Sequence, residues 1–238
     1  MLAVTRNIVI ALFTIAGCIG WAQETSPPPS SASVQPPPSA PTSPQEIGKG
    51  YVQFINATGH EGALMLWVND EGLSNRGYAS GKSTGTLPLA ESSVKIKGVL
   101  GDLEETEIGL TVKAKYLHLV VARVVIEEKK GKPPTPKLVL QSTEFAPGTS
   151  VSPSALLVLQ LTNVPVLDVS FGEGAISLAY GKPQVLEVSA RMGSFPRIVF
   201  RNTIVESFNF HDPAHRGAVL FTDKTGGLRS AVFNTLIP

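Results

Sequence analysis

The sequence predicts an all-β protein: two tandem antiparallel β-sandwich domains of Ig-like type that follow a signal peptide and a Pro/Ser-rich linker. Three observations lead to this prediction. Apolar residues either alternate with polar ones or form short runs of Val, Leu and Ile, as in strands. Gly (22) and Pro (19) residues punctuate these segments, and none of them has a helical stripe with caps. Similar strand segments also recur in the same order in two parts of the chain.

The first 22 residues have the features of an export signal. Arg6 supplies a positive start, and the apolar stretch Asn7–Gly17 is too short to span a bilayer. We therefore expect residues 1–22 to be a signal peptide and the mature protein to be periplasmic or extracellular.

Two processing sites compete within this segment. Gly20 and Ala22 place small residues where signal peptidase requires them, so cleavage before Gln23 yields a soluble protein. The alternative is Ile15–Cys18, which resembles a bacterial lipobox; an acylated Cys18 then makes the protein an outer-membrane lipoprotein. Membrane contact is expected only through this lipid. Cys18 is the only cysteine, so the domains contain no disulfide.

Residues 23–48 are expected to be a linker. The tract Glu24–Pro44 consists mainly of Pro, Ser and Thr and has almost nothing apolar to bury. Such a composition favours an extended, semi-rigid tether between the signal and the folded part.

From Gly50 onward, two kinds of strand are expected. Ser93–Gly98 and Gly109–Lys115 alternate apolar residues with Lys or Thr, as in strands with one buried face. Tyr116–Ile126 and Leu156–Asn163 are almost continuously apolar, which fits strands covered on both faces or strands that pass from one sheet to the other.

Two pairs of segments indicate an internal repeat. Val52–Asn56 (VQFIN) aligns with Leu159–Asn163 (LQLTN), and Ser93–Gly101 aligns with Val185–Gly193. The pairs occur in the same order, as two copies of one unit would give.

The charged, Pro-rich segment Glu127–Lys137 lies between the copies. Segments of this composition often connect compact units. We therefore expect one sandwich domain at residues 49–147 and a second at residues 154–238.

Gly77–Thr84 (GYASGKST) resembles a phosphate-binding loop, but its spacing is wrong. Such a loop needs four residues between its first Gly and Gly-Lys, whereas three separate Gly77 from Gly81. Pro88 also stands where the helix that holds the phosphate should run. We expect a turn between two strands, with Lys82 and Ser83 exposed, and no nucleotide cofactor.

No residue set suggests catalysis or metal binding. His211–His215 (HDPAH) is expected to be a solvated loop because Pro213 prevents the helical turn that would bring its two imidazoles together. His118 alternates within an apolar strand and is expected in the core, whereas His60 lies in a turn. A formal net charge of +1 also argues against nucleic acid as a partner. We nominate no catalytic, cofactor-binding or metal-binding residue and expect a protein that is not an enzyme.

Four segments together resemble one family, the alginate O-acetylation accessory protein AlgF. They are Tyr51–Thr58 (YVQFINAT), Gly77–Gly98 (GYASGKSTGTLPLAESSVKIKG), Lys132–Gln141 (KPPTPKLVLQ) and Leu156–Asn163 (LLVLQLTN). The resemblance is one of layout and scattered positions between Gly50 and Asp223. It implies two small β-sandwich domains in tandem in the periplasm.

The resemblance implies a non-catalytic accessory protein that assists O-acetylation of an alginate-like exopolysaccharide. Its partners are then envelope proteins of a polysaccharide-modification complex, the polysaccharide, or both. The alternative is a surface or pilus-associated adhesion module, which tethered tandem sandwiches also suit. Tyr78, in the glycine-rich turn, is the candidate contact residue, with a buried packing role as the alternative.

Overall fold

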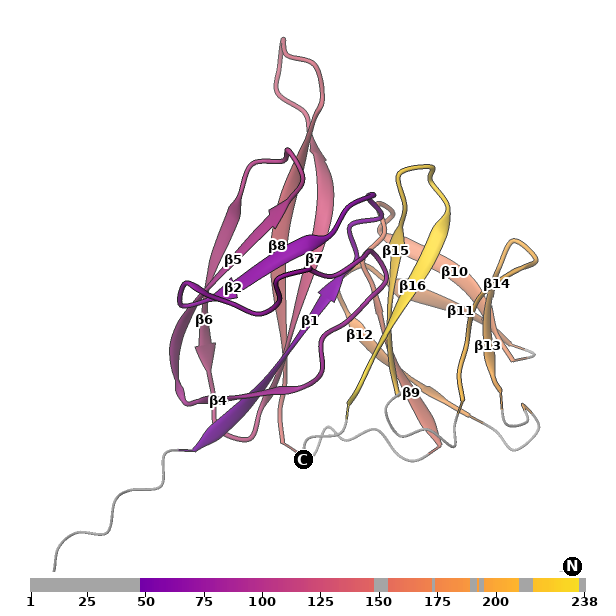
Figure 1. Ribbon diagram of the computed structural model, residues 1–238. Coiled ribbons are helices and arrows are strands. Elements are labelled where there is room, and N and C mark those ends of the chain that lie inside the picture. Colours follow the sequence, from indigo (N-terminus) through magenta and orange to yellow (C-terminus); the bar gives the residue numbers. More distant parts are fainter. Residues whose placement is uncertain are drawn as a thin grey trace, which may run out of the picture. The chain divides into compact units, whose positions relative to one another are not determined.

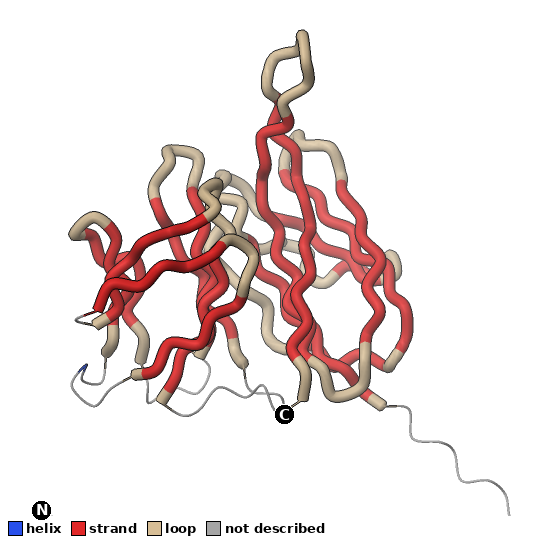
Figure 2. The backbone as a smooth tube through the Cα atoms, turned by 180° about the vertical axis from the view of Figure 1, so that it is seen from behind, coloured by secondary structure: helices blue, strands red, loops and turns tan. Residues whose placement is uncertain are grey.

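The computed structural model describes residues 48–147, 154–172, 174–188, 192, 195–209 and 216–235. In this part of the chain the backbone forms strands, turns and loops and no α-helix. The strands are the arrows of Figure 1 and the red segments of Figure 2. No helix long and apolar enough to cross a membrane is found there. The all-β prediction is therefore confirmed. The predicted signal peptide, Cys18 and all of the predicted linker except Gly48 lie outside the described residues.

The first half of the fold contains two four-stranded sheets. Its strands are β1 (Lys49–Asn56), β2 (Leu64–Val68), β3 (Glu71–Gly72), β4 (Leu87–Ala90), β5 (Ser92–Leu100), β6 (Thr106–Val112), β7 (Leu117–Glu127) and β8 (Thr135–Phe145). Sheet A has the order β4-β1-β7-β8, and sheet B has the order β3-β2-β5-β6. An apolar cluster fills the space between them, as in a sandwich.

The second half is built in the same way. Its strands are β9 (Ala155–Gln160), β10 (Val166–Phe171), β11 (Gly174–Ala179), β12 (Pro183–Glu187), β13 (Arg197–Phe200), β14 (Thr203–Ser207), β15 (Gly217–Thr222) and β16 (Leu228–Phe233). Sheet C has the order β12-β9-β15-β16, and sheet D has the order β11-β10-β13-β14.

The two halves repeat one topology. Adding eight to every strand number of sheets A and B gives the strand orders of sheets C and D. The central pairs agree as well, because β1 runs parallel to β7 and β9 runs parallel to β15, whereas the other pairs are antiparallel. The internal repeat is therefore present at the level of strands. Each half also includes one parallel pair, which alternation of apolar residues does not reveal.

One of the two sequence pairings was wrong. Val52–Asn56 lies in β1 and Leu159–Asn163 starts in β9, so these segments belong to equivalent strands. The alignment is nevertheless one residue out of register, because Tyr51 pairs with the start of β7 and Leu157 with the start of β15, so that Val52 corresponds to Val158. Ser93–Gly101 falls mainly in β5, however, whereas Val185–Glu187 lies in β12, which is equivalent to β4. Any half-buried strand shows the same alternation, so short strands match one another out of order.

The glycine turn before the fourth strand of each half is a repeated feature that the sequence reading missed. In Ala79–Lys82 and Ala179–Lys182, the last residue's N–H donates to the first residue's carbonyl, at 3.1 and 3.3 Å. Gly81 (φ +79°) and Gly181 (φ +69°) have the left-handed backbone that glycine permits. In both halves a strand follows and not a helix, as the sequence predicted for the phosphate-loop-like segment.

Three apolar clusters separate four layers in the order B, A, C, D. Sheets A and C are therefore covered on both faces. In β7, Val120 and Ala122 contact the cluster between sheets A and B, while Leu119 and Val121 contact the cluster between sheets A and C. This explains the continuous apolar runs, since successive residues of a strand point to opposite faces and here both faces are buried.

The cluster between sheets A and C contains residues of both halves, so the halves share a core. Phe145, at the end of β8, stacks on Phe233, at the end of β16, with ring centroids 6.5 Å apart. The charged segment Glu127–Lys137 does not connect the halves, because it forms the hairpin between β7 and β8 within the first half.

Candidate functional site

A polar cleft of about 420 Å³ opens where loops from the two halves meet. One wall is the β1–β2 loop together with the turn at Ser80 and Gly81, and the other wall is the β15–β16 hairpin. We call it the junction cleft. Its charged or titratable side chains are those of His60, Glu61, Asp223, Lys224 and Arg229.

Asn56, the last residue of β1, fixes the first wall. Its buried side chain donates from Nδ2 to the carbonyl of Tyr78 at 2.7 Å. Its Oδ1 accepts from the backbone N–H and the hydroxyl of Thr58, at 3.1 and 2.6 Å. The N–H of Gly81 donates to the Asn56 carbonyl at 2.8 Å. A buried amide paired in this way holds the loop and the turn in one arrangement.

Gly59 allows the two walls to approach each other. It has φ +66°, and its N–H donates to Ser80 Oγ at 3.1 Å. A Cβ at this position would lie 2.4 Å from the Cα of Asp223 and 2.9 Å from the carbonyl oxygen of Thr222. Only glycine fits here, because both the backbone angle and the neighbouring chain exclude a side chain.

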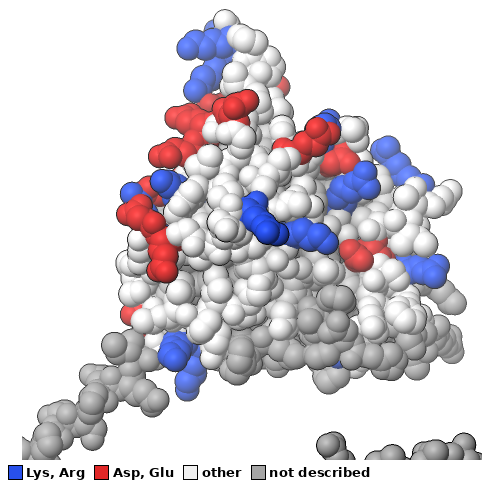
Figure 3. Space-filling view, in the orientation of Figure 1, with Lys and Arg blue, Asp and Glu red and all other residues white. Residues whose placement is uncertain are grey.

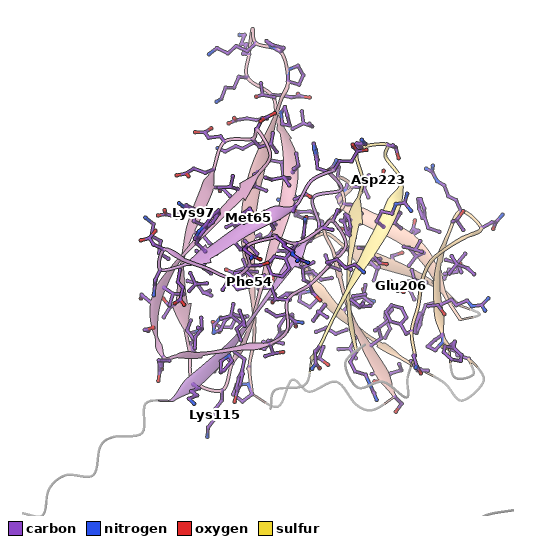
Figure 4. All side chains as sticks on the ribbon, viewed as in Figure 1. Phe54, Met65, Lys97, Lys115, Glu206 and Asp223 are labelled. Atoms are coloured by element: carbon purple, nitrogen blue, oxygen red, sulfur yellow. The ribbon has the colours of Figure 1, made fainter. Side chains whose placement is uncertain are left out.

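Asp223 organises the second wall, at the position labelled in Figure 4. Its Oδ1 accepts from the N–H and hydroxyl of Thr225, at 2.9 and 2.6 Å, and from the N–H of Gly227 at 2.9 Å. Its Oδ2 accepts from Arg229 Nε at 2.8 Å. The Thr225 hydroxyl, and then the Arg229 guanidinium, hold the pKa of Asp223 well below its usual range. The carboxylate therefore stays ionised and holds the tip of the hairpin.

Two further contacts involve residues that line the cleft. Glu61 and Lys224 form an exposed ion pair between the two halves, and the Lys224 ammonium lowers the pKa of Glu61. The hydroxyl of Ser230 donates to the carboxylate of Glu206 on β14, at 2.5 Å. Exposed ion pairs contribute little to stability, so the Glu61–Lys224 pair matters more for the surface it presents than for the fold.

The lining of the junction cleft is polar, and its charges are balanced. The two carboxylates and two cations of the junction cleft balance each other, and each carboxylate already has a cationic partner. Ser80 and Thr225 add hydroxyl groups, and His60 contributes a partly buried imidazole. Hydroxyl, imidazole and guanidinium groups around one opening can form hydrogen bonds with a ligand that is rich in hydroxyls.

The junction cleft also gathers a serine, a histidine and an aspartate, which the sequence reading did not foresee. Among the described residues, however, no hydrogen bond joins His60 to Ser80 or to Asp223. Asp223 is fully engaged within its own hairpin, and Ser80 Oγ accepts from Gly59. Nucleophilic catalysis needs a relay of hydrogen bonds between such groups.

The predicted contact residue Tyr78 lies outside this lining. Its side chain is half-buried and packs against the cluster between sheets A and B. Its N–H and carbonyl pair with Leu64 at 2.9 Å in both directions, and the carbonyl also accepts from Asn56. The packing alternative for Tyr78 is thus the one its surroundings favour. Of its neighbours in the turn, Lys82 is exposed as expected, but Ser83 is half-buried and donates to the Val232 carbonyl at 3.0 Å.

The histidines fall in different settings. His118 is 1% exposed, as predicted, and its Nε2 accepts from the N–H of Lys113 at 3.1 Å. Burial lowers its pKa, so the imidazole is neutral at neutral pH. The motif His211–His215 lies outside the described residues. Within the described ranges, no group of three or more His, Cys, Asp or Glu side chains could hold a metal ion.

Sequence reasoning missed the junction cleft because its walls are far apart in the chain. One local signal was available: Thr222–Gly227 (TDKTGG) has the Asp, Thr and Gly spacing of a turn in which the Asp side chain accepts from backbone N–H groups. That pattern predicts a hairpin tip. It does not predict that Gly59 lies against it.

Comparison with known proteins does not assign the chain to a family. No family model matches the sequence, and no curated protein is significantly similar to it. The class that the fold and site define is an all-β protein with two sandwich-like halves and a polar cleft at their junction.

Proposed function

We propose that this protein is a non-catalytic accessory protein of the cell envelope that assists O-acetylation of an alginate-like exopolysaccharide by binding the polymer or partner enzymes. The observation that carries the proposal is the junction cleft, whose hydroxyl and charged groups come from both halves and whose walls are held by hydrogen bonds of Asn56 and Asp223. The export signal predicted for residues 1–22 supports the envelope location.

The chemistry of the junction cleft favours binding. Sugar hydroxyls both donate and accept hydrogen bonds, and Ser80, Thr225, His60 and Arg229 offer partners of both kinds. Asn56 and Asp223 hold the walls in place before a ligand arrives, which reduces the entropy lost on binding. A ligand bound here needs no covalent step by the protein.

Polymer binding can be tested with the purified mature chain. We expect alginate to retard the protein in affinity electrophoresis, and the variant Lys224→Ala to weaken this effect, since Lys224 lines the cleft. The matched control is Lys95→Ala, because Lys95 also forms an exposed pair with a glutamate, at 2.7 Å from Glu107, but lies on sheet B. Equal retardation of both variants would argue against binding at the cleft.

A deletion strain tests the biological role. We expect less acetylation of the secreted polymer in that strain, while the purified protein alone does not hydrolyse or transfer acetyl esters. Turnover of an acetyl ester that is lost in His60→Ala would instead indicate an esterase at the junction cleft. Unchanged polymer acetylation together with lost surface attachment would favour the adhesion module.

A further inference from the structure

The outer edge of strand β8 differs from the other sheet edges. β8 has 11 residues and is the longest of the edge strands in the described sheets, and its pairing with β7 has no bulge. The edge strands β4 and β12 contain Pro88 and Pro183, β3 has two residues, and the pairing of β14 is irregular. Leu138–Thr143 (LVLQST) in β8 contains no proline, glycine or charged residue. Short length, proline, bulges and charges keep a sheet edge from pairing with another strand, and this stretch has none of them.

The backbone groups that β8 presents at its edge follow from the pairing of its neighbours. The N–H of Tyr51 donates to the Tyr116 carbonyl, and the N–H of Ala57 donates to the Ala122 carbonyl, at 2.8 Å each. Even-numbered residues of β7 therefore bond to β1, and odd-numbered residues bond to β8. By the β7–β8 register, the residues of β8 whose N–H and carbonyl point away from β7 are Leu138, Leu140, Ser142 and Glu144. Within the described ranges, no group forms a hydrogen bond with this outward row.

The β8 edge is recessed between two layers. On one face, Leu138 packs with Leu110 and Val112 of β6 in the cluster between sheets A and B. On the other face lies sheet C. Its edge strand β16 contacts β1, so its opposite edge strand, β12, lies on the β8 side of sheet A. The Arg123 guanidinium of β7 lies 5.3 Å from the centre of the Tyr180 ring, in the turn before β12, as this arrangement requires.

Sheet C has an exposed apolar surface beside this edge. Leu157 of β9 is 3% exposed and packs toward sheet A. Val185 lies opposite Leu157 on β12 and points to the same side, yet it is 50% exposed. On β8, the residues that point to sheet C are half-buried, namely Val139, Gln141 and Thr143. We call the outward edge of β8, together with these three side chains and Val185, the β8 edge site.

The equivalent edge in the second half is covered by the chain itself. Val232 of β16 is equivalent to Glu144 of β8, since each precedes the phenylalanine that ends its strand. The hydroxyl of Ser83 donates to the Val232 carbonyl at 3.0 Å. A Cβ on Gly81 would lie 3.6 Å from the carbonyl oxygen of Ser230 on the same edge. The segment that follows the glycine turn of the first half thus lies over the edge of β16.

The second half has no matching segment over β8. Six residues lead from Gly81 to Leu87 in β4, but three lead from Gly181 to Gln184, the equivalent residue of β12. A Cβ on Gly181 would meet nothing within 4 Å. The shorter connection cannot cover the edge of β8 in the way that Ser83 covers the edge of β16.

We propose that the β8 edge site binds one extended peptide strand of a partner protein, which adds to sheet A beside β8. The outward row supplies a ladder of hydrogen bonds, as in other cases of strand addition. Because β6 and β12 flank the edge on its two faces, the site has room for a single strand and not for a second folded sheet with its own layers. The inference goes beyond the proposed function, which depends on the junction cleft.

The surroundings also define the chemistry of that strand. Its side chains alternate between the two faces of sheet A. Those on the face of sheet C meet Val185 and Val139, whereas those on the other face lie beside the exposed Ser142. The strand should therefore alternate apolar, β-branched residues with polar ones.

The probe is a capped peptide of alternating valine and threonine with a lysine at each end, added to the isotope-labelled mature chain in an NMR titration. We expect shifts at the amides of Leu138, Leu140, Ser142 and Glu144. Two peptides N-methylated at either the valines or the threonines are a matched pair, because only one edge of the peptide can face β8. One of them should bind at least about tenfold more weakly than the parent peptide, and the other should bind like it.

Variants of the protein test the same site from two sides. Ser142→Pro removes one outward N–H and leaves the pairing with β7 intact, so peptide binding should weaken about tenfold. Val185→Lys places an ammonium group against the apolar side chains of the peptide and should weaken binding to a similar extent, without any change in β8. Ile204→Lys is the matched control, because Ile204 is also 50% exposed but lies on β14 of sheet D. It should bind as the wild type does.

Hydrogen exchange of the mature chain without peptide tests whether the edge is free. The outward amides of β8 should exchange fast, and the peptide should slow them. Slow exchange without peptide at all protein concentrations would mean that another segment of the chain covers the edge. Slow exchange that depends on concentration would mean a second copy. Either result would overturn the proposal, as would peptide binding that is unchanged in both Ser142→Pro and Val185→Lys.

The outcome for the proposed function is read separately. If alginate retards the wild type and Val185→Lys equally and the peptide does not bind, the inference fails while polymer binding stands. If the peptide binds at β8 and alginate is not bound, the strand site stands without polymer binding.

Discussion

At the scale of single residues, Gly59 and Asp223 determine how the two halves meet at the junction cleft. Gly59 has a positive φ and lies against the backbone of Asp223, and Asp223 holds that backbone in place through Thr225, Gly227 and Arg229. Gly59 has no side chain and so lets the β1–β2 loop approach the hairpin, while Asp223 keeps the hairpin backbone in position. Substitutions at the two positions should therefore destabilise the protein for different physical reasons.

Gly59→Ala should lower the free energy of unfolding by about 3 kcal/mol, because it adds steric overlap to an unfavourable backbone angle. Gly181→Ala is the matched control: Gly181 has a similar φ, +69° against +66°, but a Cβ there meets nothing within 4 Å. The control should cost about 1 kcal/mol. Urea unfolding measures both values, and equal losses would contradict the close contact between the loop and the hairpin.

Asp223→Asn should lower the free energy of unfolding by about 1–2 kcal/mol near neutral pH, since an amide accepts these hydrogen bonds less well than a carboxylate. The pKa of Asp223 is lowered in the folded protein, so its contribution is complete above the unfolded carboxylate pKa of about 3.9 and is lost as pH falls below that value. The difference between the wild type and the variant should thus shrink on acidification. Unfolding curves at several pH values would show a constant difference if this account were wrong.

At the scale of the elements, the sequence was most informative where one strand face is exposed. Val94 and Ile96 are buried and Lys95 is exposed, as alternation predicted for β5. The buried strands were recognised as well, but the sequence left open whether they were covered on both faces or changed sheets. A continuous apolar run shows that both faces of a strand are buried, but it does not predict which neighbouring sheet packs against each face.

The order of the strands in each sheet could not be predicted from the sequence, because strand pairing depends on contacts between distant segments. The parallel pairing of β1 with β7 joins residues about 66 positions apart, such as Tyr51 and Leu117. Prolines give a partial clue: Pro88 lies in β4 and Pro183 in β12, and both strands are sheet edges, where a missing N–H is tolerated. The site was harder to predict from the sequence than the fold, since the junction cleft is formed by loops from both halves.

The β7–β8 hairpin shows why composition misleads about boundaries. Glu127–Lys137 is charged and Pro-rich like a linker, and its lysines gather at the hairpin tip with acidic residues below them (Figure 3). Yet it joins two strands of eleven residues each that pair along their whole length. A cut in this segment should leave the fold intact.

Trypsin should therefore cleave the exposed segment Lys129–Lys132 without separating the fragments. The two pieces remain joined by the β7–β8 pairing and by the apolar residues of both strands, among them Leu119 and Leu138. Size-exclusion chromatography of the nicked protein should give one peak at the position of the intact chain, while a denaturing gel shows two fragments. Two separate peaks would indicate that this segment connects independent bodies.

At the scale of the molecule, the shared cluster between sheets A and C makes the halves depend on each other. Their equivalent strands face one another, and Phe145 meets Phe233 across the contact. Gly217 also allows this packing, because a Cβ there would lie 2.4 Å from the Phe233 ring. The repeat therefore behaves as an internal dimer in which neither copy is complete alone.

The described halves should accordingly unfold together in a single transition, and residues 154–238 expressed alone should aggregate. Isolation of the second half exposes large apolar side chains that the intact chain buries: Leu157, Leu159, Val219, Phe221 and Phe233. At roughly 2 kcal/mol for each, about 10 kcal/mol of burial is lost, which is comparable to the total stability of a typical domain. Differential scanning calorimetry of the mature chain should show one peak whose calorimetric and van't Hoff enthalpies agree. Two resolved peaks, or a soluble and cooperatively folded second half, would show that each sandwich is stable without the other.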